Sequence, residues 1–164
     1  MNASSRHVVI AGAGIAGLTA ALCLARHGFS VRVFERAARL EEVGAGIQLS
    51  PNATRLLARL GLLERIAATA VAPRAIELRR ADSGRSLGFV PLEETATRRW
   101  GAPYLTVHRA DIYMALAEAA ASHPAIEIET GARVRRAAFD GDGVSLEIER
   151  AGAASRERCD LAVA

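Results

Sequence analysis

Three glycines near the N-terminus constrain the fold of this chain more than any other feature. They belong to the run Gly12-Ala13-Gly14-Ile15-Ala16-Gly17, which separates an apolar stretch from an Ala/Leu-rich stretch. In a strand–turn–helix unit, the first glycine permits a tight turn, the second lets backbone approach a pyrophosphate, and the third lets helix and sheet pack closely. The helix N-terminus then presents free N–H groups and a positive dipole end to phosphates. The run therefore predicts a dinucleotide-binding βαβ unit.

An acid at the end of the next predicted strand supports this interpretation. Glu35 follows the glycines by about twenty residues, where a carboxylate can accept hydrogen bonds from both ribose hydroxyls of an adenosine. Two alternatives are a secretory signal and a glycine-rich turn that binds nothing, but neither requires this glycine spacing followed by a second strand. A third alternative is that Glu35 pairs with Arg32 or Arg36 at the surface.

Composition and charge exclude several other classes of protein. All 21 basic residues are arginines, the net charge is only +3, and no arginine run is interleaved with aromatics, so no nucleic-acid partner is expected. Cys23 and Cys159 are too far apart in the sequence to indicate a disulfide framework or a metal site. The N-terminal apolar run is short for a membrane span. We therefore expect a cytoplasmic protein with no metal and no membrane partner.

The periodicity of apolar residues and the turn residues predict the order of the elements. Strands are expected at 7–11, 31–35, 74–80, 86–91, 104–108 and 126–129, helices at 15–27, 51–60, 62–69 and 110–122, and loops at 43–49 and 92–102. From Ala132 onward the pattern has period two, with a hairpin turn at 140–143 and a third run over 156–164. An antiparallel meander added to a parallel sheet is typical of flavoproteins of the glutathione-reductase type, so this α/β order favours FAD over NAD.

Several segments then resemble a known family. GAGIAGLTAALCLARHG, VRVFER, GAGIQLSPNATRLLARLGL and VHRADI are similar, in this order, to the N-terminal part of the FAD-dependent aromatic-ring monooxygenases, which include salicylate, hydroxybenzoate and urate hydroxylases. The resemblance covers nearly the whole chain. It implies that residues 1–164 form a Rossmann-like FAD-binding domain with a parallel sheet and a β-meander. It also implies that the later FAD motifs and the substrate domain are absent from this chain, which would be inactive alone.

The resemblance implies cofactor contacts residue by residue. They are Gly12, Gly14, Ala16 and Gly17 for the pyrophosphate region, Glu35 for the ribose, Arg36 near the adenine or the phosphates, Ala45, Gly46 and Gln48 for the ribityl chain and the isoalloxazine edge, Arg109 for the phosphates, and Val134 for the adenine. Arg109 could instead be an ordinary helix-start residue, although the helix dipole disfavours a cation there. No residue is expected to be catalytic, because the flavin performs the chemistry.

The resemblance also implies a reaction. The complete protein would use NAD(P)H and O2 to hydroxylate an aromatic or heteroaromatic small molecule, and it could form a homo-oligomer. Two alternatives stay open. One is the FAD-binding part of another oxidoreductase of the same fold, such as a halogenase or a reductase, and the other is a non-catalytic nucleotide-binding module. The substrate and the choice between NADH and NADPH cannot be assigned, because this chain does not contain the residues that select them.

Overall fold

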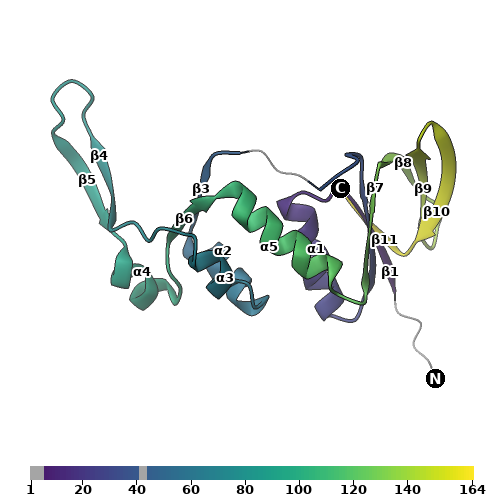
Figure 1. Ribbon diagram of the computed structural model, residues 1–164, viewed down its shortest axis with the longest axis horizontal. Helices are drawn as coiled ribbons and strands as arrows, with labels where there is room; N and C mark the ends of the chain where they lie inside the picture. Colours follow the sequence, from purple (N-terminus) through teal and green to yellow (C-terminus); the bar gives the residue numbers. More distant parts are fainter. Residues whose placement is uncertain (1–5, 41–43) are drawn as a thin grey trace. The chain divides into compact units, whose positions relative to one another are not determined.

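The computed structural model describes residues 6–40 and 44–164, which form two compact units (Figure 1). Of the described residues, 6–40 and 113–164 form the first unit, and 44–112 form the second. Helix α5 (Arg109–Ala121) begins in the second unit and ends in the first. Among the described residues, no helix has the length and apolar character needed to cross a membrane.

A parallel sheet of four strands, in the order β11-β1-β2-β7, is the centre of the first unit. Its strands are β1 (His7–Ala11), β2 (Ser30–Glu35), β7 (Ile126–Thr130) and β11 (Leu161–Val163). Val8 lies opposite Val31, and Ile10 lies opposite Val33. These side chains are buried, as expected for a parallel sheet covered on both faces. Helix α1 (Ile15–Arg26) packs against the sheet through its buried Leu and Ala residues.

A three-stranded antiparallel meander packs against the other face of this sheet. Its strands are β8 (Ala132–Phe139), β9 (Val144–Arg150) and β10 (Ala153–Cys159), in the order β10-β9-β8. Val9 and Phe34 of the parallel sheet share one apolar cluster with Leu146 and Ile148 of the meander. The predicted hairpin turn is confirmed, since the amide of Asp140 donates to the carbonyl of Gly143 at 3.1 Å.

The expectation of a single third run over 156–164 is wrong. The meander strand β10 ends at Cys159, and β11 leaves the meander to pair in parallel with β1. The chain changes sheets at Asp160, whose amide donates to the carbonyl of His7 at 2.9 Å. The carboxylate of Asp160 in turn accepts from the amide of His7 at 2.6 Å. The Asp160 carboxylate therefore provides a hydrogen-bond acceptor for the amide at the start of β1 and fixes the point where the chain leaves the meander. The alternation of apolar and polar residues does not indicate this change of sheet.

The second unit contains two small antiparallel sheets and three helices. They are β3 (Gly46–Leu49) paired with β6 (Leu105–His108), β4 (Ala75–Arg79) paired with β5 (Ser86–Pro91), and α2 (Pro51–Arg59), α3 (Leu63–Ala67) and α4 (Glu93–Trp100). Helix α2 begins as predicted, with Ser50 at the N-cap and Pro51 in the first turn. The turn between β4 and β5 also lies where the sequence placed it.

Two segments of this unit were predicted to be loops and are not. Residues 46–49 form β3, because pairing with β6 satisfies the hydrogen-bonding groups of their backbone. Their side chains show no pattern typical of a strand. Within 92–102, residues 93–100 form α4, which has two glutamates in its first turn and two arginines in its last. Those charges complement the helix dipole, and Gly101 ends the helix at φ 73°. Residue 43 of the first predicted loop lies outside the described residues.

Candidate functional site

Two of the three glycines in the loop after β1 are required by the fold itself. Gly12 has φ 109°, a value that residues with a side chain rarely adopt, and its amide donates to the carbonyl of Phe34 at 2.8 Å. A Cβ on Gly17 would lie 2.0 Å from the carbonyl oxygen of Gly12. Strand β1 and helix α1 can therefore come together only where residue 17 has no side chain.

Gly14 is different, because nothing in the described residues requires a glycine there. It is the N-cap of α1 with φ −72°, an ordinary value, and a Cβ added to it would meet no atom within 4 Å. Gly14 is exposed to solvent at the N-terminus of α1, a helix of 12 residues. A bare backbone at this point gives access to a group that approaches from outside the chain, as the sequence predicted for a pyrophosphate.

Glu35, at the end of β2, holds the glycine loop through its carboxylate. Its Oε2 accepts from the amide of Ala13 at 2.8 Å, and its Oε1 accepts from the amide of Ala37 at 2.8 Å. Among the described residues, no arginine forms an ion pair with it, and Arg32 instead pairs with Glu129 and Glu157. The alternative of a surface ion pair is therefore wrong. Each carboxylate oxygen has a second lone pair, so both can still accept a hydroxyl.

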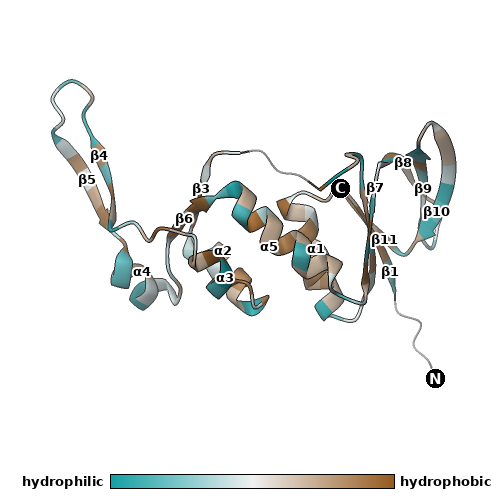
Figure 2. Ribbon diagram, viewed as in Figure 1, coloured by the Kyte–Doolittle hydropathy of each residue, from teal (hydrophilic) through white to brown (hydrophobic). Residues whose placement is uncertain are grey.

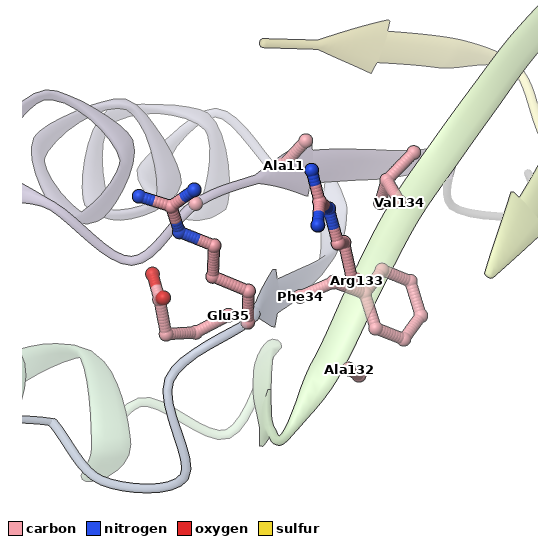
Figure 3. A pocket seen from close by; sticks show the side chains of 8 residues that line it. Ala11, Phe34, Glu35, Ala132, Arg133 and Val134 are labelled. Atoms are coloured by element: carbon pink, nitrogen blue, oxygen red, sulfur yellow. The ribbon is translucent and has the colours of Figure 1, made fainter. Parts of the chain in front are cut away.

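A cavity of about 250 Å³ lies beside this loop (Figure 3). It brings together four of the predicted residues from the turn after β1, from the end of β2 and the residue after it, and from β8, namely Gly12, Glu35, Arg36 and Val134. Ala132 and Arg133 also line it and were not singled out, although they precede Val134 in the same GARV segment. Gly14 and Ala16 lie exposed on the helix side of the loop and do not line the cavity.

The remaining predicted residues lie in the second unit, around β3. The amide of Arg109 donates to the carbonyl of Ala45 at 3.2 Å, which holds the start of α5 against the loop before β3. A Cβ on Gly44 would lie 3.2 Å from two carbons of the Arg109 side chain, so this glycine makes room for the arginine. Ala45, Gly46 and Gln48 are exposed.

Sequence reasoning missed the partner of Gln48. The hydroxyl of Tyr104 donates to Gln48 Oε1 at 2.8 Å, across the pairing of β3 with the segment that leads into β6. Residue 104 was predicted only as the start of a strand. Its contact depends on the β3–β6 register, which the sequence did not predict because β3 was expected to be a loop.

A parallel sheet with a bare glycine loop, an acid after the second strand and an antiparallel meander defines the dinucleotide-binding class of α/β flavoproteins. Residues 5–164 match the model of the FAD binding domain family. The chain belongs to this family. The predicted fold class and the choice of FAD as cofactor are therefore confirmed.

Curated relatives of the chain are named as monooxygenases and hydroxylases of hydroxybenzoates. The chain is 45% identical over 139 residues to a 3-amino-4-hydroxybenzoate 2-monooxygenase of Streptomyces cremeus, covering 85% of this chain and 34% of that protein. It is 39% identical over 145 residues to a 3-hydroxybenzoate 6-hydroxylase of Polaromonas naphthalenivorans strain CJ2, covering 88% of this chain and 36% of that protein. The chain thus spans about a third of the length of these curated relatives.

A solved structure with FAD bound has the same fold. The crystal structure of a variant of Klebsiella pneumoniae HpxO complexed with FAD superposes with a TM-score of 0.75 at 26% identity. The match covers 96% of this chain and 38% of that one. Nearly the whole chain, including both units, therefore corresponds to part of an FAD-containing protein.

Proposed function

We propose that this chain is the FAD-binding part of a flavin-dependent monooxygenase that uses NAD(P)H and O2 to hydroxylate an aromatic or heteroaromatic small molecule. The observation that carries the proposal is the bare backbone at Gly14, beside a carboxylate whose two oxygens can each accept another hydrogen bond. The relatives favour hydroxylation over the halogenase and reductase alternatives, since they are named as monooxygenases and hydroxylases. Because the chain spans about a third of their length, we also propose that the active enzyme includes sequence beyond these 164 residues.

In this proposal the first unit binds the adenosine diphosphate part of FAD. Gly12, Gly14, Ala16 and Gly17 leave the N-terminus of α1 open to the pyrophosphate, whose charge the helix dipole stabilises. Glu35 accepts the ribose hydroxyls. Of the residues that line the cavity beside it, Arg36 lies near the adenine or the phosphates, and Val134 lies near the adenine.

The second unit contacts the remainder of the cofactor. Ala45 and Gly46 offer exposed backbone to the ribityl chain, and Gln48 offers its amide group to the isoalloxazine edge. Arg109 supplies a positive charge for the phosphates at a helix start, where a cation is otherwise unfavourable. Bound FAD supplies the redox chemistry, and these residues bind and orient it.

The proposal extends to location and partners. Both cysteines are free thiols, as is usual in a reducing compartment, and we place the protein in the cytoplasm. Its partner is a small aromatic substrate, with self-association into a homo-oligomer as a further proposal.

Replacement of Glu35 tests the cofactor site. In Glu35→Gln the side chain keeps its size but loses its charge and one acceptor oxygen, so the affinity for FAD is expected to fall roughly 10- to 100-fold. The measurement is a titration of the purified chain with FAD, followed by the change in flavin fluorescence. Glu147→Gln is the matched control, because Glu147 is an exposed glutamate on β9 that does not line the cavity. Equal affinities for the two variants would refute the role of Glu35.

The reaction class needs a separate measurement on the enzyme with its additional sequence. We expect FAD-dependent oxidation of NAD(P)H that is stimulated by an aromatic acid and yields the hydroxylated product by mass spectrometry. Stimulated oxidation without any hydroxylated product would instead favour a reductase.

A further inference from the structure

The β4–β5 hairpin of the second unit exposes apolar surface on both of its strands, and Figure 2 shows the brown, apolar stretches along it. Its exposed large hydrophobic side chains are Ile76, Leu78, Leu87, Phe89 and Val90. Among the described residues, β4 and β5 pair only with each other, as a sheet of two strands. Two strands alone are marginally stable in water, whereas three or more strands with an apolar face are stable. The hairpin would therefore gain stability from a further strand.

The two free edges of this hairpin differ in their ability to accept a strand. The edge of β5 contains Pro91, which has no amide hydrogen, and one extra residue, Leu87, in its register with β4. A proline and a bulge both hinder pairing at an exposed edge. Strand β4 has neither a proline nor an extra residue. The edge of β4 is therefore the one that is open to another strand.

Hydrogen bonds on either side of β4 show which of its backbone groups face that open edge. The carbonyl of Arg74 accepts from the amide of Leu92, and the amide of Arg80 donates to the carbonyl of Arg85, both at 2.9 Å. In an antiparallel strand, alternate residues direct their amide and carbonyl toward the same neighbour. The even-numbered residues of β4 therefore face β5, and the odd-numbered residues direct their backbone groups toward the open edge.

The charges at the open edge are complementary to those of a second copy of the chain. Glu77 and Arg79 are odd-numbered, exposed and separated by Leu78. If two β4 strands pair antiparallel with their Leu78 residues opposite each other, Glu77 of each copy lies opposite Arg79 of the other. Both residues can then form backbone hydrogen bonds across the edge, and the opposite charges attract. Registers centred on Glu77 or on Arg79 instead place like charges opposite each other, which is unfavourable. Hydrogen bonding and charge thus favour the same register.

This register also joins the apolar surfaces of the two hairpins. Leu78, which is 64% exposed, would lie beside the same residue of the other copy. Ile76 lies opposite Val90 within the hairpin, and both share a face with Leu78, because alternate residues of a strand point to one face. The exposed apolar side chains on this face would therefore form one stripe across four strands.

We propose that two copies of this chain associate through the edges of their β4 strands, in the antiparallel register centred on Leu78. The proposal rests on the self-association that is part of the proposed function, but it does not depend on FAD. Arg79 Nη2 already lies 2.6 Å from Glu77 Oε2 within one chain, and each charge gains a second partner in the dimer. Because the ladder between the copies is short, the dimer is weak, with an expected Kd of roughly 10–100 µM.

Exchange of the charges tests the register. Glu77→Arg and Arg79→Glu each place like charges opposite each other in a homodimer, so each should weaken association at least roughly tenfold. An equimolar mixture of the two variants restores opposite charges at both positions and should dimerise about as strongly as the unmodified chain. The measurement is sedimentation equilibrium of the FAD-free proteins from about 5 to 500 µM, a range that spans the expected Kd.

Glu64→Arg is the matched control, because Glu64 is an exposed glutamate of the same unit that lies on α3, outside the hairpin. It changes the net charge as Glu77→Arg does and should leave association unchanged. Circular dichroism verifies that every variant folds. The affinity for FAD, measured separately, should be the same in the hairpin variants and the unmodified chain, since neither Glu77 nor Arg79 lines the cavity beside Glu35. Failure to bind FAD would contradict the cofactor site and leave the association result intact.

Three results would overturn the proposal. A chain that stays monomeric up to about 500 µM would leave the edge of β4 to other sequence of the enzyme. Equal association of Glu77→Arg, Arg79→Glu and the control would place the contact elsewhere on the chain. A mixture that associates no more strongly than either hairpin variant alone would exclude the register centred on Leu78.

Discussion

Replacing Gly17 with alanine is expected to destabilise the chain by about 3 kcal/mol or more, toward the upper end of the cost of overpacking. The added Cβ would lie 2.0 Å from the carbonyl oxygen of Gly12 and 3.4 Å from Ile10 Cγ2. The obstacle is main chain in the turn between β1 and α1, which cannot rotate away as a side chain can. Thermal unfolding followed by circular dichroism should show a fall in Tm of about 6–12 °C.

Gly14→Ala is the matched comparison, because it adds the same methyl group three residues away with a different expected outcome. Position 14 has an ordinary φ of −72° and open space around the added atom. Stability should fall by less than about 1 kcal/mol, the usual cost of a poorer N-cap. Affinity for FAD should nevertheless fall roughly tenfold or more, since the methyl group would lie where the pyrophosphate approaches. If Gly14→Ala bound FAD as tightly as the unmodified chain, the proposed approach of the pyrophosphate would be wrong.

These two glycines also show what the sequence could and could not predict. The strand, the helix and the tight contact at Gly17 follow from residues adjacent in sequence, and the structure has all of them. The period-two pattern from Ala132 onward likewise predicted β8, β9 and their hairpin, because alternation and turn residues are local signals.

The errors occurred where distant residues decide the structure. Strand β3 exists because β6, more than fifty residues later, pairs with it, and Asp160 ends the meander by bonding to His7 at the start of the chain. A hollow in the second unit also depends on distant segments, because residues of α2 line it together with Trp100 and Tyr104. Helix α4 is an exception among these errors, since the charges at its two ends and Gly101 are local sequence signals of a helix.

The second large effect is expected from Arg32, which connects the parallel sheet to the meander. Its guanidinium donates to Glu129 at 2.9 Å and to Glu157 at 2.8 Å, and it lies 5.0 Å from the centre of the Phe34 ring. Glu157 belongs to β10 and Glu129 to β7, so one side chain joins three strands. Arg32 is only 27% exposed, so Arg32→Met would remove the arginine partner of the partly buried Glu157 and one of the two arginines that pair with Glu129, at a cost of about 2–4 kcal/mol.

Acidification should diminish this effect. Hydrogen bonding to Arg150, with a smaller contribution from Arg32, holds the pKa of Glu129 below its ordinary value. A carboxyl whose pKa is lower in the folded state stabilises the protein above the pKa of the unfolded state, about 4.3, and this contribution is lost as pH falls through the lower folded value. The unmodified chain should therefore lose stability below about pH 4, and its advantage over Arg32→Met should shrink with it.

Urea unfolding of both proteins between neutral and acid pH measures this difference. Arg135→Met is the control, because Arg135 also pairs with a glutamate across the meander, Glu149, but is 45% exposed. Exposed pairs contribute about 0–1 kcal/mol, so this variant should resemble the unmodified chain at every pH. A loss in Arg32→Met that stayed constant down to pH 3 would instead assign the effect to the contact of Arg32 with Phe34, which does not depend on the charge of Glu129.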